Sequence, residues 1–417
     1  MENLVEKIDD PYMPAKPFLA RLLPAFLLLA WGIYAMLLVW IKGLNQTNMN
    51  DIYGFALWIW VDLAIIALGG GAFFTGLLTY FFKREELTAV INFAVLVGVI
   101  CYSSAMLILA IDIGQPLRFW FIFWHPNVHS MLTEVAFCLT VYYLVLNIEY
   151  LPTILNRPNF QKIPFLKNLG HNTHSIMALF AGIGVFLSFF HQGSLGGLTG
   201  VLYGRPYSYR EGFLIWPWTF FLYTWSAAAS GPCFTLILTK ICELLSGRKL
   251  IPDAVTYLLA KISGWLLLTY VIAKSIDTLY WALITAPEMG FQWSVFYTEN
   301  WLFHGYWIVF IEIVMCGFIP AIILIQKKGR QNKTVLWAAL LLTVLGLCMN
   351  RWTLVMQTVA MPVLPFENWH LYLPNWQEIA TTLLPVAWGT ILIALSMRFL
   401  PLFPAVEKLN SIENSEE

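Results

Sequence analysis

The sequence predicts an all-α, polytopic membrane protein with ten transmembrane helices. Only 12% of its 417 residues are charged and 59% are hydrophobic, whereas a soluble domain carries about 25% charged residues. Ten apolar runs reach the roughly 20 residues that a helix needs to cross a bilayer. Short motifs also recur in the same order in two halves of the chain, which predicts two four-helix bundles related by a parallel internal repeat, plus two peripheral helices.

The apolar runs define the spans in chain order. They cover about residues 18–41, 55–81, 87–111, 128–149, 172–191, 213–240, 256–280, 303–326, 334–357 and 377–399. The first run is too long for the core of a signal peptide and lacks a small-residue cleavage pattern. We therefore interpret it as a membrane anchor.

The distribution of Lys and Arg predicts that both termini lie in the cytoplasm. With that orientation, 18 of the 24 basic residues fall in cytoplasmic segments, four in outer loops and two within spans, as the positive-inside rule requires. The long outer segments are rich in Trp, Tyr, Pro and His. They indicate either anchoring at the membrane interface or a docked partner.

An internal repeat relates spans two to five with spans six to nine. The pattern Gly-Phe-x-x-Trp-x-Trp starts at Gly54 and again at Gly212, and Glu-x-x-x-Cys starts at Glu134 and again at Glu312. Because corresponding helices run in the same direction, the repeat axis is expected along the membrane normal. The predicted units are an N-terminus with span one (1–54), a first bundle (55–192), a second bundle (193–358) and a final unit with outer loop, span ten and cytoplasmic tail (359–417).

Ionisable residues within the spans are the main candidates for function, because a charge at mid-bilayer costs at least about 2.5–3.5 kcal/mol. In the predicted orientation they lie in the outer half of the membrane, and the inner half holds only His174 and a few rim residues. The first bundle contains Asp62, Asp112, Glu134 and His191, and the second contains Lys274, Asp277, Glu312 and Arg351.

The two groups support different interpretations. The first group has no Lys or Arg inside the membrane, so we expect its members to take up and release protons near neutral pH; the alternative is that they pin helices together. In the second group, Lys274 and Asp277 are three residues apart on one helix face. Those two, with Glu312 and Arg351, serve either ion passage or structure alone.

The segment LILAIDIGQPLRFW at 107–120 ends an apolar helix in an acid, a turn and a base. Asp112 lies near the interface, Gly114 and Pro116 turn the chain, and Arg118 offers a forked hydrogen-bond donor. With the flat surface of Trp120, this combination suits a hydrophobic ring that carries carbonyl groups, such as a quinone. It is equally typical of an interfacial turn that caps a helix.

This segment, Asp-x-Gly-x-Pro-x-Arg-Phe-Trp, followed by HPNVHSMLTE at 125–134, resembles the NrfD/PsrC superfamily of membrane quinone-interacting subunits. The ten-span form resembles its HybB-like branch. That branch also includes the membrane subunits of alternative complex III and of the sulfate reducers' quinone reductase complex, and we expect the chain to group with the last. The resemblance covers about residues 18–400.

The resemblance implies a menaquinone-binding subunit without haem or iron–sulfur centre, active only within a menaquinone reductase or quinol oxidoreductase complex. It implies a periplasmic, ferredoxin-like iron–sulfur partner and further molybdopterin-type or cytochrome c subunits, and no nucleic acid. It also implies a place in the bacterial cytoplasmic (inner) membrane, with the outer loops in the periplasm. The quinone site is expected in the first bundle, because Phe220 stands where Asp62 would align in the second. Proton transfer is assigned to Asp112, His191, Glu134 and Asp62, and quinone binding to Arg118, His129, Trp120 and Trp58.

Three alternatives remain open. A haem b anchor would use His174 and His191, expected at opposite depths of one helix, but no inner histidine on another span can complete the inner haem. A secondary transporter or ion channel fits the repeat and the buried charges, although helix-breaking residues at matched positions are few. A purely structural anchor is the third. The six cysteines form no CxxC pair, so the sequence encodes neither an iron–sulfur nor a zinc site, and no metal ligands are assigned.

Overall fold

The computed structural model describes residues 15–205, 207–213, 216–291, 307–362, 364, 367 and 370–403. Within these ranges ten helices are long and apolar enough to cross a membrane, which confirms the predicted number of spans. They are Phe18–Lys42, Leu57–Phe81, Glu85–Asp112, Met131–Leu155, Met177–Gly200, Trp218–Ser246, Asp253–Glu288, Ile308–Ile325, Lys333–Ala360 and Trp376–Phe399. The apolar runs form helices because a backbone in lipid must satisfy its own hydrogen bonds.

Four spans of the first half pack together. α3 lies on α4 and α6 lies on α9, while α4 contacts α6 and α3 contacts α9. Two of these spans include additional turns, η2 after α3 and η3 before α4. The bounds are α3 (Leu57–Gly76), η2 (Leu77–Phe81), η3 (Glu85–Leu87), α4 (Thr88–Asp112), α6 (Met131–Leu155) and α9 (Met177–Gly200).

Four spans of the second half form a similar group. α10 packs on α11 and α17, and the eighth span lies between α11 and α17. Three of the spans contain wide π-helical turns, η5, η6 and η7. The bounds are α10 (Trp218–Ser246), α11 (Asp253–Tyr280), η5 (Trp281–Thr285), α12 (Ala286–Glu288), α14 (Trp307–Phe310), η6 (Ile311–Phe318), α15 (Ile319–Ile325), α17 (Lys333–Trp352), η7 (Thr353–Gln357) and α18 (Thr358–Ala360).

The two groups meet along α3 and α10. A Cβ added to Gly71 would lie 2.5 Å from the carbonyl oxygen of Gly231, so the two backbones touch there. Small residues commonly permit such close approach between membrane helices. α10 also packs on α9, and the two groups therefore share a broad interface.

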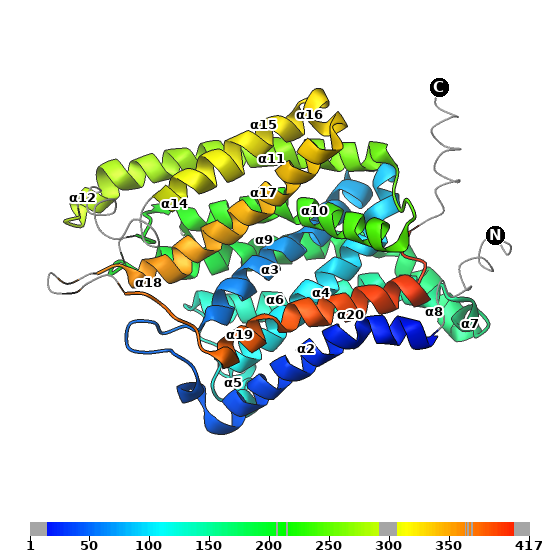
Figure 1. Cartoon of the computed structure of the whole chain (residues 1–417), viewed down its shortest axis with the longest axis horizontal. Coiled ribbons are helices and arrows are strands. Elements are labelled where there is room, and N and C mark those ends of the chain that lie inside the picture. The colour runs from blue at the N-terminus through cyan, green and yellow to red at the C-terminus, as the bar shows by residue number, and fades with distance from the viewer. Residues whose placement is uncertain are drawn as a thin grey trace.

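The first and last spans lie outside both groups and pack on each other (Figure 1). They comprise α2 (Ala15–Lys42), α19 (Trp376–Thr382) and α20 (Leu384–Phe399). α20 contacts α4, and Trp388 donates a hydrogen bond of 2.9 Å to Ser103 Oγ. Both peripheral spans therefore belong to the side of the first bundle.

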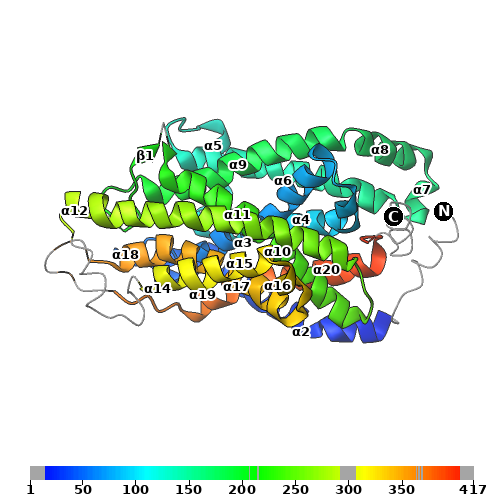
Figure 2. The same cartoon turned by 90° about the horizontal axis from the view of Figure 1, so that it is seen from above.

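Short elements gather at the two ends of the helices (Figure 1, Figure 2). One end, named here the α5 end, carries η1 (Leu44–Gln46), η4 (Pro116–Arg118), α5 (Phe121–Trp124) and the antiparallel pair β1 (Gly212–Phe213) and β2 (Trp216–Pro217). The opposite end, named the α8 end, carries α7 (Pro158–Gln161), α8 (Pro164–Ser175) and α16 (Lys327–Gln331).

The fifth span differs from its predicted bounds of 172–191. It begins at Met177 and continues to Gly200, so that His191 lies inside the helix and not at its end. Its last residues are rich in glycine and resemble a loop in the sequence. They are helical because α10 packs very closely there: a Cβ added to Gly196 would lie 2.5 Å from the carbonyl oxygen of Thr219.

Candidate functional site

The start of α3 is joined to the end of α4 at the α5 end. Trp58 Nε1 donates a hydrogen bond of 2.9 Å to Oδ1 of Asp112. Trp58 is fully buried, whereas Asp112, the last residue of α4, is half-buried. Apolar packing thus fixes the donor, and the carboxylate keeps access to its surroundings.

Asp62 lies one turn further along α3 and is only 1% exposed. Its Oδ1 has no hydrogen-bond partner among the described residues, and it lies within electrostatic reach of Asp112. No ion pair reaches either carboxylate in the described part of the chain. The structure therefore brings together two of the predicted acids, without a compensating cation.

His191 lies deeper in the bundle and is completely buried. Its Nδ1 is 2.8 Å from the carbonyl oxygen of Leu187, which can only accept, so Nδ1 carries the proton. The other nitrogen, Nε2, is 2.6 Å from the hydroxyl of Tyr102 and accepts a hydrogen bond from it. Both ring nitrogens are thus engaged within the protein.

Three neighbours of His191 were missed by the sequence analysis. The ring of Tyr142 lies 4.6 Å from that of Tyr102 and 5.5 Å from that of His191, between centroids. Gln192 donates to the carbonyl oxygen of Ile66 at 2.9 Å. The Tyr142 hydroxyl and Gln192 Oε1 are buried without a partner among the described residues. Tyrosines are common in membrane helices, so nothing in the sequence distinguished these two.

Four further predicted residues lie at the surface of the α5 end. Arg118 in η4, Trp120 and His129 are exposed, and Glu134 in the first turn of α6 is half-buried. Trp120 donates to the carbonyl oxygen of Leu117 at 3.0 Å. No ion pair joins Arg118 to Asp112 among the described residues, so the base and the acid of the motif are not paired.

Large apolar side chains are exposed next to that junction. This aromatic surface comprises Leu117, Phe119, Trp120, Phe121 and Trp124, each of them at least 44% exposed. The rings of Trp120 and Phe121 lie 4.3 Å apart between centroids. An exposed apolar patch of this kind marks contact with a partner or with lipid.

In the second bundle, Asp277 is paired more closely than expected. Arg210 Nε lies 3.0 Å from both of its carboxylate oxygens, while Lys274 Nζ is 4.0 Å from the nearer one. All three side chains are buried. Arg210 was counted as a loop residue in the sequence, and only the folded chain brings it to Asp277.

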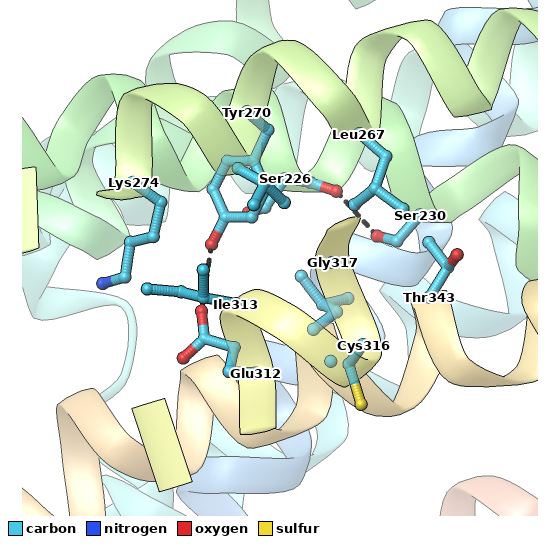
Figure 3. A pocket seen from close by; sticks show the side chains of 13 residues that line it. Ser226, Ser230, Leu267, Tyr270, Lys274, Glu312, Ile313, Cys316, Gly317 and Thr343 are labelled. Atoms are coloured by element: carbon cyan, nitrogen blue, oxygen red, sulfur yellow. Dashed lines mark hydrogen bonds between the residues drawn. The ribbon is translucent and has the colours of Figure 1, made fainter. Parts of the chain in front are cut away.

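Glu312 and Arg351 make no direct ion pair. Asn350 lies between them, since its Nδ2 donates to Glu312 Oε1 at 3.0 Å and its Oδ1 accepts from Arg351 Nη1 at 2.6 Å. Arg351 also lies 3.6 Å from the centre of the Tyr223 ring. Glu312 lines a small cavity together with Lys274 and Tyr270 (Figure 3).

Two other acids within the spans were not predicted. Glu378 at the start of span ten accepts hydrogen bonds from the backbone N–H groups of Asn48 at 2.7 Å and Leu57 at 3.0 Å. Glu149 lies in α6 toward the α8 end, within electrostatic reach of Tyr80. His174 was expected on the fifth span but lies on α8, so the spans carry Glu149, and not His174, toward the α8 end.

The described residues contain no cluster of three His, Cys, Asp or Glu side chains that could hold a metal ion. All six cysteines are free. What the first bundle offers instead is a set of carboxylates, phenols and an imidazole close to an aromatic surface. Such groups can donate, accept and move protons next to a flat apolar molecule.

Comparison with known protein families shows where the chain belongs. Residues 43–362 match the model of the family described as "Polysulphide reductase, NrfD". The chain belongs to this family. As an NrfD-family chain with ten apolar spans, it is a multi-pass membrane protein.

Relatives of this NrfD-family chain are found in several bacteria. It is 49% identical, over 92% of both chains, to a protein of Nitratidesulfovibrio vulgaris described as "Menaquinone reductase, integral membrane subunit". It is 23% identical, over 87% of both chains, to the "Probable Ni/Fe-hydrogenase 2 b-type cytochrome subunit" of Escherichia coli. It is 24% identical to a selenate reductase subunit of Mesobacillus selenatarsenatis, over 89% of this chain and 91% of the relative.

Proposed function

We propose that this chain is the menaquinone-interacting membrane subunit of a respiratory oxidoreductase complex. It exchanges electrons between a periplasmic iron–sulfur partner and membrane menaquinone, with proton exchange near the periplasmic face. The observation that carries the proposal is the 49% identity, over 92% of both chains, to a protein described as the integral membrane subunit of menaquinone reductase.

The first bundle provides groups that suit a quinone. Quinone carbonyl oxygens need hydrogen-bond donors and, on reduction, protons. Asp62 Oδ1 and the Tyr142 hydroxyl are buried without partners among the described residues, so they can engage a ligand at no cost to existing bonds. When bound, menaquinone supplies the two-electron redox chemistry that the side chains themselves lack.

In this proposal the residues have distinct roles. Asp112 moves the proton between the site and water, and Trp58 Nε1 holds its carboxylate in place. Asp62 and Glu134 relay protons, while Tyr102 and His191 form a hydrogen-bonded pair deeper in the bundle. The quinone is bound from the surface of the α5 end by Arg118, His129 and Trp120. Quinone enters from the lipid between helices.

The α5 end is assigned to the periplasm because the charge distribution of the sequence favours cytoplasmic termini. The aromatic surface then faces the partner subunit, and we assign it to docking of a ferredoxin-like iron–sulfur protein. Molybdopterin-type or cytochrome c subunits would complete the complex. The complex would lie in the cytoplasmic membrane.

The haem alternative is disfavoured by the contacts of His191. Its Nδ1 is bonded to the Leu187 carbonyl and its Nε2 to Tyr102, so an iron ion would have to displace one of these bonds. His174, the other histidine of that alternative, lies on a separate helix. An absorption spectrum of the purified chain distinguishes the two: a Soret band with a reducible α-band would support haem.

Purification of the chain from its native membrane tests the proposal. We expect it to co-purify with an iron–sulfur subunit, and the assembled complex to reduce a soluble menaquinone analogue or oxidise its quinol. Omission of the chain should abolish this activity while the partner's own reaction with an artificial dye persists. Purification of the chain alone, with no redox activity in any assembly, would contradict the proposal and favour a transporter or an anchor.

A further inference from the structure

The second bundle contains a buried charge cluster that the proposed quinone chemistry does not use. It comprises three cations and two carboxylates, all buried. They are Arg210, Lys274, Arg351, Asp277 and Glu312. With every group ionised the cluster carries one net positive charge, and it becomes neutral when one proton leaves. A buried set whose charge depends on a single proton is a candidate proton-binding site.

Two of the five groups, Arg210 and Asp277, are paired with each other. Arg210 forms the close ion pair with Asp277 and also donates from Nη1 to the carbonyl oxygens of Tyr207 and Tyr209. The pair lies toward the α5 end of α11. It closes the cluster at that end, because its atoms are buried and bonded.

Arg351 is held by neutral groups. It donates to Asn350 Oδ1, to the carbonyl oxygen of Tyr223 at 3.2 Å and to Ser226 Oγ at 3.0 Å, and its guanidinium lies over the Tyr223 ring. Guanidinium groups keep their proton in proteins. The groups left to exchange a proton are therefore Lys274 and Glu312.

Lys274 and Glu312 both line the same cavity (Figure 3). Its volume of about 10 Å³ is close to the minimum that holds one water molecule. Glu312 Oε1 accepts from Asn350 and, at 3.3 Å, from the Tyr270 hydroxyl. Glu312 Oε2 is buried without a partner among the described residues. A water molecule in the cavity would satisfy this atom.

The groups that face Glu312 come from every helix around it. α11 contributes Tyr270 and Lys274, with Asp277 one turn beyond; α17 contributes Asn350 and Arg351; α10 contributes Tyr223. Glu312 itself lies in the wide turn η6. Such turns are frequent at functional sites because they redirect side chains.

A row of polar residues leads from the cavity toward the α8 end. Thr256, Ser263, Tyr270 and Asp277 follow each other at intervals of seven residues on α11, and all four are buried. Seven residues are about two turns, so the four lie on one face, and the part of the row from Tyr270 at the cavity to Thr256 spans roughly 21 Å.

Other polar residues lie beside the middle of the row and at its α8 end. Ser263 and Thr343 each lie beside Cys233, and all three side chains are buried. A second cavity of about 30 Å³ lies at the α8 end, lined by Thr256 together with Lys240 and Glu243. Hydroxyl groups and small cavities thus connect the cluster to one side of the membrane.

We propose that Glu312 and Lys274 form a proton-binding site around one water molecule, and that this site exchanges protons with the α8 end along the polar row. Neighbouring hydroxyl groups of the row are about 10.5 Å apart along the helix, so water molecules between them must complete the path. On loading, a proton from water at the α8 end passes along this path and is shared by the Glu312 carboxylate and the neutral Lys274 amine, so that the loaded pair includes the carboxylic acid form of Glu312. On unloading it returns by the same path. The Arg210–Asp277 ion pair prevents passage to the α5 end. The proposal does not depend on quinone chemistry.

Infrared difference spectroscopy of the full chain in lipid nanodiscs tests the site. A pH jump should give the carbonyl band of a protonated carboxylic acid, which Glu312→Gln removes. Lys274→Met should shift the midpoint of that band by about one pH unit or more. Glu288→Gln is the matched control, since Glu288 is exposed on the same continuous span. A band that persists in Glu312→Gln would overturn the site.

Exchange of the same band in heavy water tests the route. Ser263→Val should slow the deuterium shift by about tenfold or more, because one hydroxyl of the row is lost. Ser275→Val is the control: Ser275 lies on the same helix off the row and donates to the Val271 carbonyl. Equal exchange rates in the wild-type protein and in Ser263→Val would overturn the route along the polar row.

Discussion

Trp58 Nε1 lies 2.9 Å from Oδ1 of Asp112, and this hydrogen bond joins the first turn of α3 to the last residue of α4. The two residues are 54 positions apart in the chain. Their contact places a half-buried carboxylate next to the buried Asp62 and beside the aromatic surface. In the proposed function this is where protons meet the quinone.

Removal of the Asp112 carboxylate should stop this proton exchange. Asp112→Asn keeps the shape and can still accept from Trp58, but it cannot carry a proton. Quinone turnover of the assembled complex is expected to fall by about 10²-fold or more, since positioned general acids and bases contribute 10²–10⁴. Asp51→Asn, an exposed acid just before α3, is the control. Full turnover in Asp112→Asn would exclude Asp112 as an essential proton carrier.

The indole N–H group of Trp58 should contribute to the kcat/KM for the quinone. Trp58→Phe fills most of the buried space and loses the bond to Asp112, which for a charged acceptor is worth about 1.5–3 kcal/mol. We expect about a tenfold or larger loss in the kcat/KM for the quinone analogue. Trp60→Phe also loses an indole hydrogen bond, here to the neutral Cys348 carbonyl, and should leave this parameter within about twofold. A similar loss in both variants would indicate a general effect on folding.

The Tyr102–His191 bond should contribute to stability. Tyr102→Phe leaves His191 Nε2 buried without a donor, which costs about 1–3 kcal/mol. The apparent Tm of the detergent-solubilised chain should fall by a few degrees. Tyr34→Phe, an exposed tyrosine on α2, should not change it. Equal melting of the wild-type chain and Tyr102→Phe would show that the bond carries no net stability.

Glu378 should hold span ten to the first bundle. Glu378→Gln replaces one acceptor oxygen by an NH₂ group that faces backbone donors, either Asn48 or Leu57. We expect a loss of about 1–3 kcal/mol and faster proteolysis of the segment between η1 and α3. Glu378→Asp should recover part of the protection. Unchanged protease sensitivity in Glu378→Gln would refute this role.

The segment before α3 should lose stability at alkaline pH. Burial raises the pKa of Tyr53 from 10 to about 12, and burial also raises the pKa of Tyr372, whose ring packs on Tyr53. Because the folded state favours the protonated phenols, their contribution is complete below pH 10 and is lost as the pH rises toward 12. Tm measured from pH 9 to 12 should fall less steeply in Tyr53→Phe. Parallel profiles would contradict this.

Most of the fold follows from the hydropathy of the sequence, because each span is a continuous apolar run. The exception is instructive: the residues from Gly193 to Gly200 are weakly apolar, and their helix depends on close packing against α10. Such packing partners are distant in the sequence. Local composition therefore predicts the number of spans better than their ends.

The candidate site was predictable only in part. Asp112 was recognised from the motif that follows it, and Asp62 from its charge within an apolar run. The partners of His191 and Glu378 lie 89 and 321 residues away along the chain, and no local pattern specifies such contacts. The contact of Arg210 could not be predicted either, because its position in a loop of the sequence does not indicate the buried ion pair with Asp277.

A photoreactive menaquinone analogue tests the central claim most directly, that the first bundle holds the quinone. It should be added to the intact complex, irradiated, and the labelled peptides of this chain mapped by mass spectrometry. The account predicts labelling within residues 57–62 and 107–124, suppressed by excess unmodified menaquinone. Competable labelling confined to α11, η6 and α17 of the second bundle would contradict it.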